Sequence, residues 1–402
     1  MTNGNPSDTA TACDIAIVGG GLAGGLAALA IHRAHPGLRL RLFEAGAHLG
    51  GTHRWSWFDS DLLQPEAELL AEFSTTSWPL GTQVIFPGHR RELSAPYRSL
   101  ASTDFDSTLR RLLPDDAIRC DAPVTRLDAQ GVTLGDGQRI TARAVIDCRD
   151  FPPSRTLTGG WQLFVGRHIR TAQQHGLDRP IIMDADLPQH GAYRFVYSLP
   201  LSPHDIFVED TYYANQPELD RAALGDRIAA YCTARRWDGE ILGEEHGVLP
   251  VLTGGDFPAY RGEVSTSGVA LAGARGLFTH PLTSYTLPFA AANALAIAEA
   301  AQLPGCALAG LMDQRAAQHW HATQFYRLLG KMLFEAAEPE HRYRIFERFY
   351  RLPEPLIERF YAGCSTGRDR LRILSGKPPV PIHRAIAAML GKGAPLVQED
   401  AQ

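Results

Sequence analysis

Two adjacent acidic residues, Glu209 and Asp210, lie in the stretch RFVYSLPLSPHDIFVEDTYYA, residues 194–214. Neighbouring side chains on a strand point to opposite faces, so the two carboxyls should point in opposite directions. We expect one of them to enter an apolar, aromatic space, where burial raises the pKa of a carboxyl and lets it exchange a proton near neutral pH. The alternative is a surface acid pair near the end of a hairpin strand.

Aromatic residues are expected to gather around the same space. If they lined a tunnel for a long apolar ligand, their π faces would stabilise a carbocation. The alternative for each of them is packing in an ordinary hydrophobic core. These residues are Trp55, Trp57, Phe58, Trp161, Phe195, Tyr197, Tyr212 and Tyr213.

A glycine turn near the start of the chain has the spacing that holds a pyrophosphate. Gly19, Gly21 and Gly24 follow the pattern G-x-G-x-x-G, in which the glycines permit a tight turn, a close approach of the backbone and close packing of the next helix. Glu44 falls 20 residues after Gly24, where a ribose hydroxyl needs an acceptor. We therefore predict a dinucleotide site, because a glycine-rich turn without a ligand leaves Glu44 unexplained.

The glycine turn needs strands and a helix to position it. Residues 14–18 and 38–43 are short apolar runs typical of buried parallel strands, and residues 26–34 supply a helix whose N-terminal amides attract phosphates. Residues 124–150 predict a β-meander, and residues 268–276 predict a further apolar strand. Together these segments predict one doubly wound nucleotide-binding unit.

The dinucleotide is predicted to be FAD rather than NAD. Glu44 is followed by AGAHLGGTHRW, and an acid, a short loop and a Gly-Gly pair resemble the flavoprotein version of the motif. The glycine segment at 273–275 resembles the late flavoprotein segment that touches the pyrophosphate and ribityl chain. Pro288 should then begin a helix whose dipole favours negative charge near the flavin ring, the alternative being an ordinary capped helix.

Composition excludes several other classes of protein. The chain has 402 residues, 45% of them hydrophobic, and a net charge of −5, which gives no electrostatic footprint for nucleic acid. Residues 1–12 lack the pattern of a signal peptide, and the apolar run 289–301 is shorter than the ~20 residues that cross a bilayer. The six cysteines are scattered and predict reduced cytosolic thiols. We expect no metal site, because the histidines are dispersed as well.

The flavin segments lie on both sides of a long middle, so the FAD domain should be discontinuous. The middle has β character, and the turn from Ser202 to Asp205 should join two strands as a hairpin. This sheet is expected to form the roof of a substrate cavity over the flavin. The predicted ranges are 12–60, 100–155 and 265–310 for the FAD-binding domain, 61–99 and 156–264 for the β-roof domain, and 311–402 for a helical C-terminal region.

Within that last region, residues 341–363 read HRYRIFERFYRLPEPLIERFYAG, with aromatic residues between arginines. Pro353 and Pro355 should divide the stretch into two helices. One interpretation is a membrane-surface face, with apolar side chains in lipid and arginines at head groups. The alternative, which the 3.6-residue apolar stripe favours, is two amphipathic helices packed on the core.

Blocks of sequence along nearly the whole chain resemble those of bacterial lycopene beta-cyclases. They are IVGGGLAGGLAA, RLRLFEAGAHLGGTHRWSW, PIIMDA, YRFVYSLPLSP, VEDTYY, HPLTSYTLPFAAANA, RIFERFYRLPEPLIERFYAG and DRLRILSGKPPVP. Ordinary FAD oxidoreductases do not carry the last two blocks. The chain departs from the pattern where it reads HPLTSYT for the common HPTTGYS, which places Ser284 at a glycine position, and where Asp150 replaces a usual glycine.

The resemblance implies a fold and a reaction. The fold is the hydroxylase-like FAD architecture: α/β, with a Rossmann-like doubly wound sheet, a β-roof substrate domain and a helical C-terminal region. The reaction converts lycopene to γ-carotene and β-carotene by protonation at C2, ring closure and loss of a proton from C6, without net redox change. FAD must be reduced, with NAD(P)H as diffusible reductant. A cytoplasmic enzyme bound peripherally to the inner face of the cell membrane is implied, because lycopene resides in lipid.

The resemblance also implies roles for particular residues. The family's acidic motif maps onto Glu209, the first candidate for acid and base, and onto Asp210, the second. Expected substrate contacts are Trp55, Trp57, Trp161, Phe195, Tyr197 and Tyr213. Expected cofactor contacts are Gly19, Gly21, Leu22, Ala23, Gly24, Glu44, Ala45, Gly51, Thr52, Val124, Gly273, Arg275, Thr283, Ser284 and Tyr285.

Two other functions compete with the cyclase. One is a flavin-dependent monooxygenase or dehydrogenase of another apolar isoprenoid, and the other is a carrier without activity.

Overall fold

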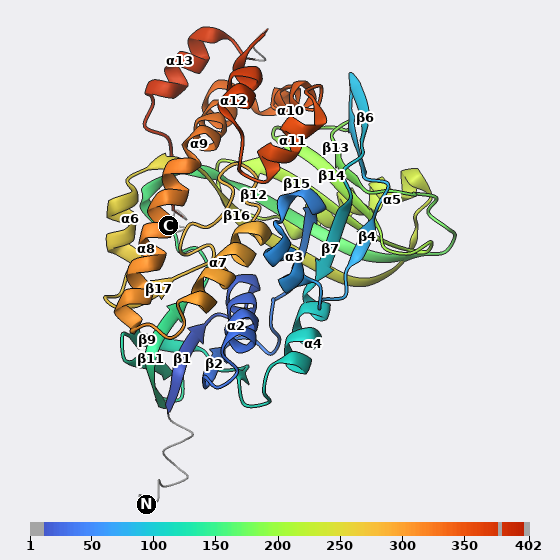
Figure 1. Ribbon diagram of the computed structural model, residues 1–402. Helices are drawn as coiled ribbons and strands as arrows, with labels where there is room; N and C mark the ends of the chain where they lie inside the picture. Colours follow the sequence, from blue (N-terminus) through green and yellow to red (C-terminus); the bar gives the residue numbers. More distant parts are fainter. Residues whose placement is uncertain (1–11, 377–379, 398–402) are drawn as a thin grey trace, which may run out of the picture.

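The computed structural model describes residues 12–376 and 380–397. The predicted N-terminal stub up to residue 11, and residues 377–379 and 398–402 of the predicted helical region, lie outside this description. The described chain contains a seven-stranded, an eight-stranded and a three-stranded sheet. In Figure 1 the seven-stranded sheet lies near the N terminus, the eight-stranded sheet crosses the middle, and helices α9 to α13 gather at the other end.

The seven-stranded sheet has the predicted doubly wound α/β character. Its order is β8-β2-β1-β11-β10-β9, with β17 beside the end of β11, and β1 is parallel to both β2 and β11. The predicted meander is confirmed as β9, β10 and β11, which pair antiparallel. The strands are β1 (Ala12–Val18), β2 (Leu40–Phe43), β8 (Ile118–Arg119), β9 (Val124–Asp128), β10 (Gly131–Leu134), β11 (Arg139–Asp147) and β17 (Val269–Leu271).

Apolar side chains of this sheet are covered by helices. Ile15 and Ile17 of β1 are fully buried in one core cluster with the alanine-rich faces of α2 and α7. Small side chains let these two helices approach closely, so the start of each can lie near the carboxyl ends of the strands. The helices on this part of the chain are α2 (Leu22–Ala34), α3 (Gln64–Leu70), α4 (Ser102–Leu112), α6 (Phe257–Val264), α7 (Leu287–Glu299) and α8 (Gly305–Ala322).

The eight-stranded sheet is the predicted roof. Its order is β16-β12-β15-β14-β13-β5-β6, and β18 pairs with β12. Neighbours are antiparallel except β13 and β5. The strands are β5 (Thr82–Phe86), β6 (His89–Leu93), β12 (Ser154–Thr171), β13 (Ile181–Asp184), β14 (Tyr193–Pro200), β15 (Asp205–Ala214), β16 (Gly239–Gly255) and β18 (Pro395–Leu396).

The two faces of the roof meet different parts of the protein. Val196 and Val208 pack against helix α5 (Arg221–Arg235). Alternate residues such as Phe195 and Tyr213 join an aromatic cluster with residues of the C-terminal helices. Because strand side chains alternate, this division decides which side of β15 faces the interior of the molecule.

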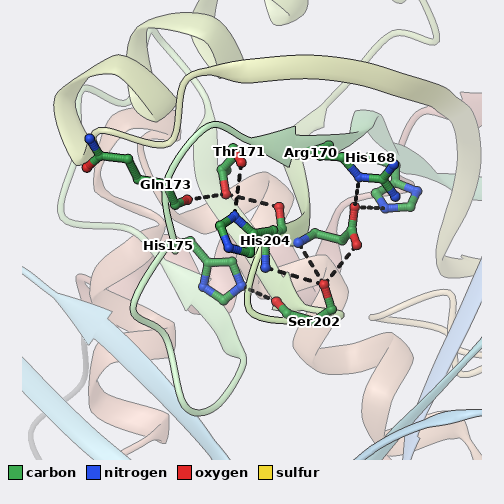
Figure 2. Close-up of polar contacts among 8 residues, drawn as sticks. His168, Arg170, Thr171, Gln173, His175, Ser202 and His204 are labelled. Atoms are coloured by element: carbon green, nitrogen blue, oxygen red, sulfur yellow. Dashed lines mark hydrogen bonds and ion pairs between the residues drawn. The ribbon is translucent and has the colours of Figure 1, made fainter.

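A polar network fixes the hairpin turn between β14 and β15, and Figure 2 shows it together with the end of β12. Ser202 Oγ accepts the Asp205 N–H at 3.0 Å and donates to its carboxylate at 2.8 Å. Arg170 donates to the same carboxylate at 2.9 Å, and Thr171 Oγ1 donates to the His204 carbonyl at 3.0 Å. These bonds hold the predicted turn, which in turn fixes the register of Glu209.

A third, three-stranded sheet of order β3-β7-β4 stands beside the roof. It consists of β3 (Arg54–Phe58), β4 (Thr76–Trp78) and β7 (Tyr97–Ala101), and the short helix η1 (Asp59–Asp61) follows β3. The sheet combines residues from the ranges predicted for the FAD domain and for the roof. It therefore gives the dinucleotide unit and the roof a shared wall.

The C-terminal helices close the aromatic side of the roof. Phe346, Tyr350, Ile357 and Phe360 lie in the buried cluster with the roof strands, so the aromatic side chains of residues 341–363 pack inward, as the core-packing alternative predicts. In the described part of the chain, no helix combines the length and apolarity that a bilayer span requires. These helices are α9 (Gln324–Lys331), η2 (Met332–Ala336), η3 (Pro339–His341), α10 (Tyr343–Phe349), α11 (Glu354–Tyr361), α12 (Gly367–Leu374) and α13 (Ile382–Leu390).

Candidate active site

The glycine turn between β1 and α2 has the shape of a phosphate cradle. Gly19 has φ of +99°, and a Cβ on Gly24 would lie 2.0 Å from the Gly19 carbonyl oxygen. A Cβ on Gly21 would meet no atom within 4 Å, so this residue borders open space. Gly21 precedes α2 and contributes no side-chain cap, which leaves the first amides of a 13-residue helix available to an anion.

Glu44 ends β2 beside this turn. Its carboxylate accepts the Gly20 N–H at 2.7 Å and the Gly46 N–H at 2.8 Å. The two bonds hold the acid at the edge of the cradle, where the predicted ribose acceptor must stand.

Two arginines share one buried aspartate on the other side of the cradle. Asp147 ends β11, and its carboxylate accepts two bonds from Arg149 at 2.8 and 2.7 Å. Arg275 Nε lies 3.6 Å from the same carboxylate and is buried without a hydrogen-bond partner among the described residues. The cluster carries a net positive charge and one unused donor, so the set suits a pyrophosphate.

A single cavity of about 730 Å³ connects the cradle with the roof. Its lining runs from Gly19 and Glu44 at one end, past Trp55 and Tyr285, to Glu209 on β15. A dinucleotide at the cradle and the reacting end of an apolar substrate near Glu209 can therefore share one continuous cavity.

Glu209 is the acidic side chain that faces this space from the roof. Burial raises its pKa to about 8, the nearby charges of Glu245 and Asp210 act in the same direction, and a hydrogen bond from Thr211 opposes the shift. The Thr211 hydroxyl donates to Glu209 Oε1 at 2.6 Å. At neutral pH this carboxyl is mostly protonated, as a general acid must be.

Asp210 points away from the cavity, which corrects its expected role as a second acid. It is fully buried on the opposite face of β15, where Arg194 Nε and Nη2 donate to its carboxylate at 2.9 and 2.5 Å. Burial raises its pKa, and the bonds from Arg194 oppose that shift. The alternation of a strand predicted that the two acids would separate, and the structure assigns Asp210 to an ion pair.

Glu245 is a second carboxyl on the same face of the roof as Glu209, outside the cavity lining, and sequence analysis missed it. Gly166 on β12 pairs with Glu209 on one side and with Glu245 on the other, so all three lie in one row across the sheet. Residues in one row share a face, and Gly166 places no side chain between the two acids. Burial raises the pKa of Glu245 to about 7, and the charge of Arg54 opposes the shift.

On another side of the cavity, the carboxyl of Asp61 lies close to several tyrosine hydroxyls. Tyr285 donates to Asp61 Oδ2 at 2.5 Å, and the Phe58 N–H donates to the same oxygen at 2.8 Å. The hydroxyls of Tyr97 and Tyr197 are 2.7 Å apart. Tyr197 pairs directly with Glu209 in the sheet, so hydroxyl groups extend along the cavity from one acid towards the other.

The turn before α7 positions Tyr285 through a buried histidine. His280 Nδ1 accepts the N–H groups of Leu282 and Thr283, each at 3.3 Å, and Nε2 lies 3.1 Å from the Phe360 carbonyl oxygen. Burial lowers the pKa of His280 to about 3, so the ring is neutral. Ser284 has φ of +55°, and its hydroxyl donates to the Pro250 carbonyl at 2.8 Å.

Most predicted contact residues line the cavity. The residues that do so are Gly19, Gly21, Leu22, Ala23, Glu44, Ala45, Gly51, Val124, Gly273, Arg275, Thr283, Ser284 and Tyr285 from the cofactor set, and Trp55, Phe195, Tyr197 and Tyr213 from the substrate set. Gly24 does not line the cavity, but its lack of a side chain permits the close contact with the Gly19 carbonyl that shapes the cradle.

Three predicted contacts lie elsewhere. Thr52 is exposed and outside the cavity lining. Trp57 is 2% exposed within the core of the nucleotide-binding unit. Trp161 packs in a separate cluster, because the alternate positions Gln162 and Phe164 of β12 face the cavity instead.

Sequence analysis also missed Asp147 and Arg149, although their position at the end of an apolar strand could have indicated a ligand contact. Asp147 is the last residue of the apolar strand β11, Arg149 lies two positions beyond it, and Glu44 likewise follows the end of β2. Polar groups at the carboxyl ends of parallel strands commonly meet the ligand. Asp61 gave no such signal, because it follows a short strand that carries no motif.

Comparison with known proteins finds relatives that match nearly the whole chain. The family model described as "Lycopene cyclase protein" matches residues 14–387. Lycopene beta-cyclase of Pseudescherichia vulneris is 42% identical over 378 residues, 94% of this chain and 97% of that protein. Lycopene beta-cyclase of Paracoccus sp. (strain N81106 / MBIC 01143) is 40% identical over 389 residues, 96% of this chain and 99% of that protein.

The fold has counterparts among solved flavoproteins. A flavin-dependent brominase superposes with a TM-score of 0.62 at 16% identity, covering 88% of this chain and 94% of that chain. At this identity the likeness concerns the fold alone, and it agrees with the α/β flavoprotein architecture described above. Since the family model and both bacterial relatives extend over nearly the full length, the chain belongs to the lycopene cyclase family.

Proposed function

We propose that this protein is a lycopene beta-cyclase, which closes the acyclic ends of lycopene to give γ-carotene and then β-carotene. The observation that carries the proposal is Glu209, a carboxyl of raised pKa in the same cavity as the dinucleotide cradle. An acid that is protonated at neutral pH inside an aromatic cavity can start a carbocation reaction that water would otherwise quench.

The chemistry follows from the position of Glu209. Its carboxyl gives a proton to C2 of the substrate, C1 becomes a tertiary cation, and the C5–C6 double bond forms the new bond from C6 to C1. The positive charge moves to C5, and loss of the proton on C6 restores a double bond. Phe195, Tyr197 and Trp55 line the cavity, and their ring faces stabilise the passing positive charge.

We propose that the cradle holds FAD. Gly19, Gly21 and the start of α2 would receive the pyrophosphate with Arg149 and Arg275, and Glu44 would accept a ribose hydroxyl. When bound, reduced FAD, with NAD(P)H as its diffusible reductant, would supply negative charge near the cation, and no electrons would remain in the product. The open space at Gly21 and the Arg275 N–H at Nε, which has no hydrogen-bond acceptor among the described residues, support this assignment.

The test is an anaerobic assay with lycopene, FAD and NADPH. Glu209→Gln should lower cyclisation by about 100-fold or more while retaining bound flavin. Glu244→Gln is the matched control, because Glu244 lies on the roof next to Glu245 but binds Arg167 and Arg221. Absence of any cyclic carotene with the wild type would refute the proposal, and NADPH consumption stoichiometric with product would identify a monooxygenase or dehydrogenase instead.

We propose in addition that the enzyme works in the cytoplasm, bound peripherally to the inner face of the cell membrane, through α12 and α13. These helices carry Leu371 and Leu390, which are 71% and 82% exposed, together with the exposed Leu374 and Ile386. Arg368 and Arg372 flank Leu371 and are exposed as well. Apolar side chains among arginines match the requirements of an anionic lipid surface.

Sedimentation with anionic lipid vesicles tests this location. The double variant Leu371→Asp, Leu390→Asp should bind less than the wild type. Leu63→Asp is the control, because Leu63 is 72% exposed on another part of the molecule, in the loop before α3. Equal binding by all three proteins would contradict the assignment of α12 and α13.

A further inference from the structure

The reaction proposed above needs two proton transfers, and the cavity has a second proton-handling group. Tyr285 lines the cavity from the turn before α7, whereas Glu209 lines it from the roof. The Tyr285 hydroxyl donates to Asp61 Oδ2 at 2.5 Å, and Asp61 Oδ1 is buried without a hydrogen-bond partner among the described residues. The carboxyl behind Tyr285 can therefore receive a proton without losing an existing bond.

We propose that Tyr285 removes the C6 proton after ring closure, that Asp61 stores it, and that Glu209 acts only as the donor to C2. This assignment rests on the proposed cyclase function. Tyr285 is then a catalytic residue, and Asp61 is a positioning residue that acts through it.

The proton balance of this step is complete. The electrons of the C6–H bond form the C5–C6 double bond, the proton goes to the Tyr285 oxygen, and the original phenolic proton of Tyr285 passes to Asp61. Glu209 ends ionised and Asp61 ends protonated. A carbon-bound hydrogen next to a tertiary cation is strongly acidic, so a phenol backed by a carboxylate is a sufficient base.

Two further hydroxyl groups lie on the wall of the cavity near both carboxyls. The hydroxyls of Tyr97 and Tyr197 lie 2.7 Å apart, and Tyr197 pairs with Glu209 across β14 and β15. Tyr97 and Tyr197 both act electrostatically on Tyr285. The surroundings of Tyr285 and of Glu209 therefore share these two tyrosines.

The charged surroundings of Asp61 favour the proton-storing role. Burial raises its pKa to about 7, the charges of Glu358 on α11 and of Asp59 on η1 raise it further, and the bonds from Tyr285 and the Phe58 N–H lower it. The other titratable groups that face it from α11 and the following loop are Tyr361 and Cys364. At neutral pH Asp61 is therefore partly ionised while Glu209 is mostly protonated, so the two carboxyls suit opposite roles.

Two measurements separate this role from a structural one. The C5 cation can also lose a proton from C4 or from its methyl group, so the position of the ring double bond reports where the base stands. The rate profile should fall below about pH 7, where Asp61 takes up its proton, and above about pH 8, where Glu209 loses its own.

The experiment compares Asp61→Asn and Tyr285→Phe with the wild type, with flavin content measured in each. We expect β-ring formation to fall by about 100-fold, a larger share of rings with the double bond elsewhere, and no acidic limb in the Asp61→Asn profile. Asp59→Asn is the matched control, because Asp59 lies on the same short helix but binds Arg98 at 2.5 Å. It should keep the wild-type ring product and the wild-type rate near neutral pH, and it should retain an acidic limb that moves to lower pH, because the charge of Asp59 raises the pKa of Asp61.

The outcomes distinguish this inference from the function on which it rests. A wild type that forms no cyclic carotene refutes the cyclase itself. A wild type that cyclises, with both variants giving only β rings at its rate and an unchanged pH profile, overturns the role of Asp61 and Tyr285. If Tyr285→Phe does not fold, the isosteric Asp61→Asn and the acidic limb of the wild-type profile decide.

Discussion

The replacement Glu209→Gln should change how the stability of the folded protein depends on pH. The pKa of this carboxyl rises from 4.5 to about 8 on folding, and each unit corresponds to about 1.4 kcal/mol. Because the folded state holds the proton more tightly, this contribution is fully present below pH 4.5 and is lost as pH rises to about 8. Between these two pH values, the free energy of unfolding of the wild type should therefore fall by roughly 4 to 5 kcal/mol relative to that of the glutamine variant.

The assay is urea unfolding of flavin-free wild type and variant at intervals from pH 4 to pH 9, with the difference in free energy of unfolding plotted against pH. We expect the difference to grow in favour of the variant through the interval and to level off above pH 8. Glu244→Gln should give a change of opposite sign at the acid end of the series and a flat difference above it. Bonds from Arg221 and Arg167 lower the pKa of Glu244 from 4.5 on folding, so this contribution is lost only as pH falls below that value. A flat difference curve for Glu209→Gln would show that the carboxyl is not buried as described, and the argument for a neutral general acid would fail.

Three further replacements test other parts of the structure. Asp210→Asn leaves the guanidinium of Arg194 buried without its partner, so urea unfolding should show a loss of about 3 kcal/mol or more. The pH profile of activity should keep both limbs, with the basic limb moved to lower pH, because the charge of Asp210 no longer raises the pKa of Glu209. Gly24→Ala would place a methyl group 2.0 Å from the Gly19 carbonyl, so the purified protein should lack flavin absorbance. Ser284→Gly should be more stable than Ser284→Ala by about 1 kcal/mol, because both lack the hydroxyl and only alanine keeps the unfavourable positive φ; equal unfolding midpoints would contradict this.

The nucleotide-binding half could be predicted because its constraints are local. Gly19, Gly21 and Gly24 are required by backbone geometry that recurs at fixed spacing, and Glu44 ends the next strand, so four positions sufficed to predict the cradle. The same regularity predicted that Glu209 and Asp210 would face opposite sides. It could not decide which acid faces the cavity, because that depends on helix α5 and Arg194, which cover the other side of the sheet.

Residues brought together by tertiary packing were harder to predict. Asp61 and Tyr285 are 224 positions apart and meet only because η1 and the turn before α7 pack beside the same cavity. Trp161 was expected in the cavity as one of a set of aromatic residues, although the alternation of β12 directs Gln162 and Phe164 there instead. The arginine-rich aromatic stretch at 341–363 has the same periodicity whether it faces lipid or a core, so only the partner surface decides between them.

The ion pair between Arg194 and Asp210 affects how the strands of the roof align with one another. A slip of one position would turn each acid, together with its apolar neighbours, to the other face of β15. On the face away from the cavity, Arg194 donates to both carboxylate oxygens of Asp210. The slipped pairing would break these bonds and place an aspartate among the aromatic rings, so misaligned strands are disfavoured before any ligand arrives.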